Sequence, residues 1–130
     1  MNDKGEYSNW DSHHDVDAAL KIILNTLVLD CRILELSEVF SPESPVVALE
    51  GEPGWELELL GKEPGLPIRL SSSMQACIEP EAYFLSFPQF VCSVSEFSQY
   101  LIEGLNSTRI PETAKEDIKK VLSCLQTLEA

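Results

Sequence analysis

One stretch of sequence decides the fold: Val46-Val47-Ala48-Leu49-Glu50-Gly51-Glu52-Pro53-Gly54-Trp55-Glu56-Leu57-Glu58-Leu59. It opens with two β-branched residues, which favour a strand. Glycine and proline then mark a turn at 51–54. After the turn, apolar and acidic side chains alternate strictly over 55–59. The pattern predicts an antiparallel hairpin that pairs 46–50 with 55–59 and largely buries Trp55, with Leu57 and Leu59 also facing inward.

Two further strands are predicted downstream of the hairpin. Residues 61–67 contain two glycines and two prolines, which indicates another turn. Ile68-Arg69-Leu70 is a plausible third strand. The run from Ala82 to Phe87 is rich in aromatic residues and predicts a fourth strand ended by Pro88, with 90–92 as a possible continuation along the edge. Residues 71–80 are ambiguous.

Helical spacing of apolar residues appears before and after these strands. It predicts a helix over 15–29, and the short run 31–36 could extend this helix or begin a strand. Ser93 and Glu96 match the capping-box pattern that starts a helix. That helix should carry Phe97, Tyr100, Leu101 and Leu105 on one face and end near Gly104. A last helix is predicted over 111–128, with Pro111 in its first turn.

This order of elements predicts an α+β fold: an N-terminal helix, an antiparallel β-meander of about four strands and two C-terminal helices. One or both terminal helices should cover one face of the sheet. With 130 residues, the chain suits one domain. We therefore expect a loose polar arm at residues 1–14 and a single α+β domain at 15–130.

The chain is strongly acidic, with 22 acidic and 9 basic residues and a formal charge of −13. This charge argues against direct binding of nucleic acid, which requires a basic face, and against adsorption on anionic membranes. The N-terminal residues lack the basic and apolar regions of a secretory signal, and no apolar run is long enough to cross a bilayer. We expect a cytoplasmic protein.

Candidate metal and catalytic residues are few. The four cysteines have no zinc-like spacing, and we expect free thiols without a disulfide. His13 and His14 could join nearby aspartates in a metal site, but adjacent histidines point in different directions, and a polar arm is the simpler interpretation. No glycine-rich phosphate loop or nucleophile motif is present. The sequence therefore predicts no cofactor, no metal and no catalytic residue.

The acidic residues are concentrated around the predicted hairpin. No lysine or arginine lies between Arg32 and Lys62, whereas this interval contains seven carboxylates, at Glu35, Glu38, Glu43, Glu50, Glu52, Glu56 and Glu58. If Trp55 faces inward, Glu56 and Glu58 share the outward face and should be exposed, and Glu50 can approach them across the turn. Such a surface either aids solubility or binds a basic partner. We predict partner binding by Glu50, Glu52, Glu56 and Glu58.

The segment Pro80-Glu81-Ala82-Tyr83-Phe84-Leu85-Ser86-Phe87-Pro88-Gln89-Phe90-Val91-Cys92-Ser93, followed by a helix with Phe97, Tyr100 and Leu101, resembles the small bacterial immunity proteins that neutralise polymorphic toxins, including those of contact-dependent growth inhibition. Size, acidity and the α+β order fit as well. The resemblance covers about a quarter of the chain and supplies no specific motif. It implies a cytosolic, non-catalytic protein that binds one cognate toxin domain, expected to be basic and nuclease-like, and blocks its active site. A monomer is expected rather than a dimer.

Two other functions remain open from the sequence. Type III secretion chaperones are also small, acidic, α+β and cytosolic, but they are usually dimers and tend to begin directly with a helix. A small enzyme is the third alternative, and it would require a deep polar pocket with perturbed titratable groups.

Overall fold

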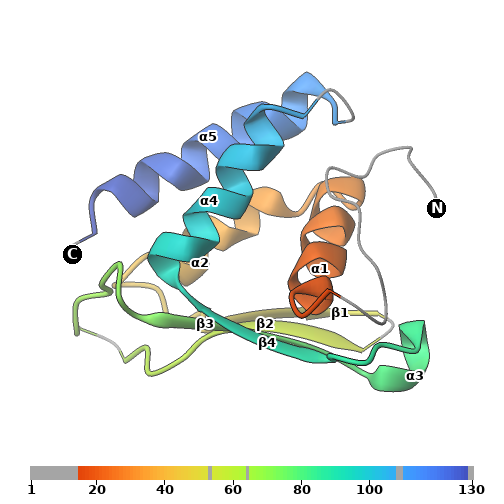
Figure 1. Cartoon of the computed structure of the whole chain (residues 1–130). Helices are drawn as coiled ribbons and strands as arrows, with labels where there is room; N and C mark the ends of the chain where they lie inside the picture. Colours follow the sequence, from red (N-terminus) through yellow and green to blue (C-terminus); the bar gives the residue numbers. More distant parts are fainter. Residues whose placement is uncertain (1–14, 53, 64, 108–109, 129–130) are drawn as a thin grey trace.

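The computed structural model describes residues 15–52, 54–63, 65–107 and 110–128 (Figure 1). The predicted arm at 1–14, including His13 and His14, lies outside the described residues. The fold is α+β, as the sequence predicted. It contains an N-terminal helix, a four-stranded antiparallel sheet and two long C-terminal helices, with short helices in the connections.

The sheet is a meander in the order β1-β2-β3-β4. Its strands are β1 (Ala48–Gly51), β2 (Trp55–Leu59), β3 (Ser73–Ile78) and β4 (Gln89–Ser93). The predicted hairpin is confirmed, because β1 pairs antiparallel with β2. Trp55 is 3% exposed, and Leu57 and Leu59 are buried beside it. The alternation in β2 therefore does separate a buried face from a polar one.

The prediction of a third strand at 68–70 is wrong. In that segment only Arg69 forms an isolated bridge, and the third strand is β3, from the stretch that looked ambiguous. Its residues alternate between half-buried and buried along Ser-Met-Gln-Ala-Cys-Ile. These are mostly weak strand formers. A strand paired on both sides gains its stability from neighbours and burial rather than from intrinsic propensity.

The prediction of a fourth strand at 82–87 is also wrong. Pro80–Tyr83 form the short helix α3, and Phe84 follows in the left-handed conformation with φ of 54°. Proline at the first helical position favours this helical turn, and the left-handed residue ends it. The fourth strand, β4, begins only at Gln89, so the residues 90–92 suggested as an edge continuation do belong to a strand.

The first helix, α1, covers Ala18–Leu29 and begins three residues later than predicted. The undecided run after it is neither an extension nor a strand. Cys31 has a positive φ of 56°, which ends the helical path, and the 3-10 helix η1 (Ile33–Glu35) leads directly into α2 (Leu36–Val39).

The two C-terminal helices are α4 (Val94–Leu105) and α5 (Glu112–Gln126). The capping box at the start of α4 is confirmed: Glu96 N donates to Ser93 Oγ at 3.0 Å, and Ser93 N donates to Glu96 Oε1 at 2.8 Å. The helix α4 ends at Leu105, near Gly104, as the sequence predicted. Gly104 itself is not the residue that ends it. It is buried inside the last turn, and Asn106 caps the helix. Pro111 directly precedes α5 in an extended conformation.

The helices α1, α2, α4 and α5 all lie on one side of the sheet (Figure 1). The core fills the space between, and α1 packs directly on β2, β3 and β4. Within the described ranges, no helix has both the length and the apolar character needed to cross a membrane. The opposite side of the sheet is not covered by any described helix. We call it the outer face; it comprises the side chains of Ala48, Glu50, Glu56, Glu58, Ser73, Gln75, Cys77, Gln89, Val91 and Ser93.

Candidate functional site

Three of the predicted partner-binding glutamates meet on the outer face. The hairpin register places Glu50 directly opposite Glu56. Glu58 lies two residues further along β2 and therefore points to the same side. Side chains directly opposite on neighbouring antiparallel strands have Cβ atoms about 5 Å apart. The hairpin thus places Glu50, Glu56 and Glu58 on the same face, as the sequence predicted.

The fourth residue, Glu52, lies in the turn itself and completes the rim of a shallow hollow. The hollow has a volume of about 610 Å³ and is lined by Glu50, Gly51, Glu52, Gly54, Trp55, Glu56, Cys77, Ile78 and Glu79. Glu58 lies on the same face but not in the hollow. Sequence reasoning missed Cys77 and Glu79, because it did not recognise β3.

Glu79 is held beside the turn by the backbone. Its N–H donates to the carbonyl oxygen of Gly54 at 3.0 Å. Gly54 has a φ of 112°, and a Cβ there would lie 2.7 Å from Cδ of Glu79. Only glycine therefore leaves room for this carboxylate next to the turn.

The four predicted glutamates differ in exposure. Glu50 and Glu52 are exposed, whereas Glu56 and Glu58 are half-buried, so the expectation that both would be exposed is wrong. The cause is the position of β2 inside the sheet. Glu56 lies between Glu50 and Cys77, and Glu58 lies between Ala48 and Gln75. Neighbouring side chains on both sides cover part of each carboxylate.

The thiol of Cys77 lies in this negative environment. Burial is the main cause that raises its pKa, and the charges of Glu56 and Glu58 raise it further. A hydrogen bond with Gln89, its neighbour on β4, opposes the shift. A thiol with a raised pKa stays protonated at neutral pH and is a poor nucleophile. The outer face therefore offers hydrogen-bond acceptors and negative charge rather than a reactive group.

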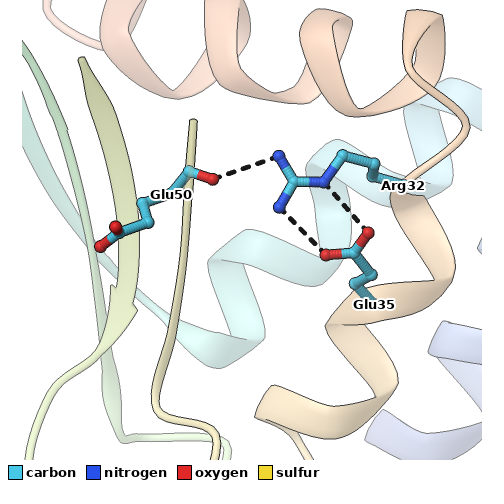
Figure 2. A network of polar contacts seen from close by, with 3 residues as sticks. All are labelled: Arg32, Glu35 and Glu50. Atoms are coloured by element: carbon cyan, nitrogen blue, oxygen red, sulfur yellow. Dashed lines mark hydrogen bonds and ion pairs between the residues drawn. The ribbon is translucent and has the colours of Figure 1, made fainter. Parts of the chain in front are cut away.

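Arg32, the base that precedes the acidic stretch, bonds the backbone of the hairpin but does not neutralise a carboxylate of the outer face (Figure 2). Its Nε and Nη2 each donate to one carboxylate oxygen of Glu35 at 3.0 Å, and its Nη1 donates to the backbone oxygen of Glu50 at 3.2 Å. Figure 2 shows the Glu50 carboxylate pointing away from the guanidinium. The arginine thus fixes the Glu50 backbone and leaves the Glu50 side chain free.

Lys62, the base that follows the acidic stretch, is also occupied by backbone oxygens. Its Nζ donates to the carbonyls of Glu38, Val39 and Val46 at 3.0, 2.8 and 2.5 Å. Lys21, Arg32, Lys115 and Lys119 form ion pairs in the described part of the chain. In this part of the chain, none of them reaches a carboxylate of the outer face.

Other chemistry has little support in the described ranges. No group of three His, Cys, Asp or Glu side chains there is arranged to hold a metal ion. The four cysteines, Cys31, Cys77, Cys92 and Cys124, are free thiols. What the hollow can do is accept hydrogen bonds and attract cationic groups. Protein-family models, curated proteins and solved structures give no match to this chain, so an interpretation of the site depends on its own geometry.

Proposed function

We propose that the chain is a non-catalytic cytoplasmic immunity protein whose outer face binds a basic surface of a cognate, nuclease-like toxin domain. One observation carries this proposal. Glu50 on β1 and Glu56 on the neighbouring strand β2 lie directly opposite each other, and no cation of the described residues forms an ion pair with either. Like charges in directly opposite positions destabilise a sheet. A surface that tolerates this cost is well suited to a partner that supplies the missing positive charge.

The electrostatics support a protein partner of opposite charge. The chain has a formal charge of −13, and complementary fields speed the encounter of two proteins. Nucleases bind phosphates through basic surfaces, and an acidic face of matching shape would compete for such a surface. Glu56 and Glu58 lie on a strand that is paired on both sides. Their backbone is therefore already ordered, which lowers the conformational entropy that is lost on association.

The test starts from the gene directly upstream. We expect it to encode a large secreted protein whose C-terminal domain is toxic. The association rate of that domain, made catalytically inactive, is measured with the intact chain at low and high salt. The double variant Glu56→Lys/Glu58→Lys should slow association by about tenfold or more at low salt and should weaken the salt dependence.

A matched control changes the net charge equally in another place. Glu112→Lys/Glu116→Lys alters two exposed carboxylates on α5, in the helix layer. We expect it to affect the rate much less than the outer-face variant. Equal effects of both variants would place the interface elsewhere. A toxin domain that does not bind the chain, or stays active in its presence, would contradict the function itself.

A further inference from the structure

The two edges of the sheet are treated differently by the rest of the chain. At the β1 edge, Arg32 Nη1 donates to the carbonyl oxygen of Glu50, and Lys62 Nζ donates to that of Val46. Helix α2 packs against this strand as well. The β1 edge is therefore covered, which is a common way to prevent unwanted pairing.

The β4 edge presents free backbone groups. Ile78 N donates to Pro88 O at 2.9 Å, and Val94 N donates to Ser72 O at 2.7 Å, so these bonds bracket β4. Because hydrogen bonding alternates along an antiparallel pair, Phe90 and Cys92 turn their backbone groups toward β3. The N–H and C=O groups of the alternate residues, Gln89 and Val91, point to the open side. No described residue bonds to them.

The segment that leads into β4, together with β4 itself, exposes unusual apolar surface. The side chains of Phe84, Phe87 and Val91 are 77%, 40% and 51% exposed, and all three lie within eight residues of sequence. Phe84 is the most exposed large apolar side chain of the described residues, and its backbone is left-handed. Exposed aromatic side chains in the segment that leads into an unpaired strand are typical of recognition surfaces.

We infer that the β4 edge binds an extended, basic segment of a partner protein, which adds to the sheet as a fifth strand. Backbone groups of Gln89 and Val91 would provide hydrogen bonds, while the apolar side chains nearby would provide packing. The inference rests on the proposed function only for the positive charge of the partner. It adds a second contact region, because β4 is separated from β2 by a whole strand.

The charge near β4 argues for a basic segment rather than a second copy of this chain. Glu96 is exposed just after the strand, where its carboxylate accepts a hydrogen bond from the backbone N–H of Ser93. On the helix side, Phe90 packs edge-on against Tyr100, whose hydroxyl donates to Asp17 at 2.6 Å. Lys21 Nζ lies 3.3 Å from the same carboxylate, so the preference for a basic segment depends on Glu96 and on the net charge of −13. Pairing β4 with itself would bring two strongly negative chains together, which their mutual repulsion opposes.

The probe for this inference is a blocked ten-residue peptide that alternates lysine and valine. It is titrated into the isotopically labelled full chain, and amide exchange is followed by NMR. We expect saturating peptide to slow exchange at Gln89 and Val91 by about tenfold or more, because their N–H groups become hydrogen-bonded. Two control peptides should bind much more weakly: one is N-methylated at alternate amides, and the other replaces lysine with glutamate.

A pair of variants tests the backbone contact directly. Val91→Pro removes the outward N–H but no bond to β3, and proline is tolerated on edge strands. Val91→Thr keeps the N–H and a β-branched side chain. We expect the peptide affinity to fall by about tenfold with proline, and to change by no more than about threefold with threonine. Near-ultraviolet circular dichroism checks that both variants fold; if Val91→Pro does not, the exchange data on the natural chain decide.

Several results would overturn the inference. One is slow exchange at Val91 in the free chain, as slow as at Phe90 and Cys92, because the edge would already be paired. Others are equal binding of the N-methylated peptide and a concentration-dependent dimer that Val91→Pro abolishes. The two proposals can fail separately. If the peptide binds the edge but the upstream toxin domain does not bind the chain, the proposed function fails and the edge inference stands. If the toxin domain binds both Val91 variants equally, the proposed function stands and the β4 edge is not where that partner adds a strand.

Discussion

The guanidinium carbon of Arg32 lies 5.3 Å from the centre of the Trp55 ring. The arginine follows α1, and the tryptophan opens β2, so this contact joins the helix layer to the hairpin. The same guanidinium also bonds the Glu35 carboxylate and the backbone of Glu50. One side chain therefore holds the backbone from which the acidic outer face projects.

We expect Arg32→Met to lower the free energy of unfolding by about 1–2 kcal/mol, because it removes charge-assisted hydrogen bonds and a cation–π contact while keeping an unbranched side chain. Urea denaturation measures this loss. Lys120→Met is the control, since Lys120 is exposed on α5 and should change the stability by less than about 0.5 kcal/mol. Equal stability of the two variants would show that the Arg32 contacts contribute little.

A second prediction concerns the repulsion between Glu50 and Glu56. Glu56→Lys should raise the free energy of unfolding by about 0.5 kcal/mol, because a repulsive cross-strand pair becomes attractive. The gain should shrink at high salt, where both interactions are screened. Glu63→Lys serves as the control for net charge, because Glu63 is exposed in a loop and forms none of the ion pairs described above. A variant that gains stability but binds the toxin domain more slowly would indicate that the carboxylate is kept for binding; a loss of stability would contradict the repulsion.

Alkaline pH should destabilise the fold. Burial raises the pKa of the Cys92 thiol from near 9 to about 12, and burial with the Asp17 hydrogen bond raises the pKa of the Tyr100 hydroxyl. In both cases the folded state holds the proton more tightly, so the stabilisation is complete below the unfolded pKa and is lost as pH rises toward the folded pKa. For Cys92 this window lies between about pH 9 and about pH 12.

Denaturation at several values from about pH 8 to about pH 11 tests this. The free energy of unfolding should fall as pH rises in the natural chain, and it should fall less steeply in Cys92→Ala. The smaller side chain also lowers the stability of this variant by an amount that does not depend on pH, so the slopes are compared rather than the absolute values. Tyr100→Phe should also flatten the curve. Identical slopes in all three proteins would show that these groups do not govern the alkaline transition.

The turn of the hairpin should tolerate little added volume. A Cβ at Gly51 would lie 2.8 Å from Cζ2 of Trp55, so Gly51→Ala should cost about 1–3 kcal/mol of stability and shift the Trp55 fluorescence. Gly61→Ala is the matched control, because nothing lies within 4 Å there and only its positive φ, 74°, makes alanine unfavourable. An unchanged emission spectrum of Gly51→Ala would contradict the close packing.

The hairpin and the capping box could be predicted from sequence because each depends on residues close together in the chain. Strict alternation in β2 determines which side chains are buried, and Ser93 needs only Glu96 to complete its cap. The central strand β3 could not be identified in this way, since its weak strand formers are stabilised by partners on both sides. The aromatic run at 82–87 has high strand propensity but does not form a strand. A helical turn ends at Tyr83 there, and Phe84 follows in the left-handed conformation.

The same contrast holds for the candidate site. Glu50, Glu56 and Glu58 could be placed on one face because a short turn fixes their register. Cys77 and Glu79 enter the hollow only through the pairing of β3 with β2, which no local pattern reveals. The exposure of Glu56 was misjudged for the same reason, since the strand that covers it on one side had not been recognised.

Helix α5 packs against α4 and η1, in the part of the helix layer farthest from the sheet (Figure 1). Lys119 and Lys120 are exposed on this helix. A sensor chip, bead or fluorescent dye attached through these lysines would therefore leave the outer face and the β4 edge directed toward the solution. This orientation makes the chain convenient as an immobilised bait, because coupling chemistry and partner capture would use opposite sides of the molecule.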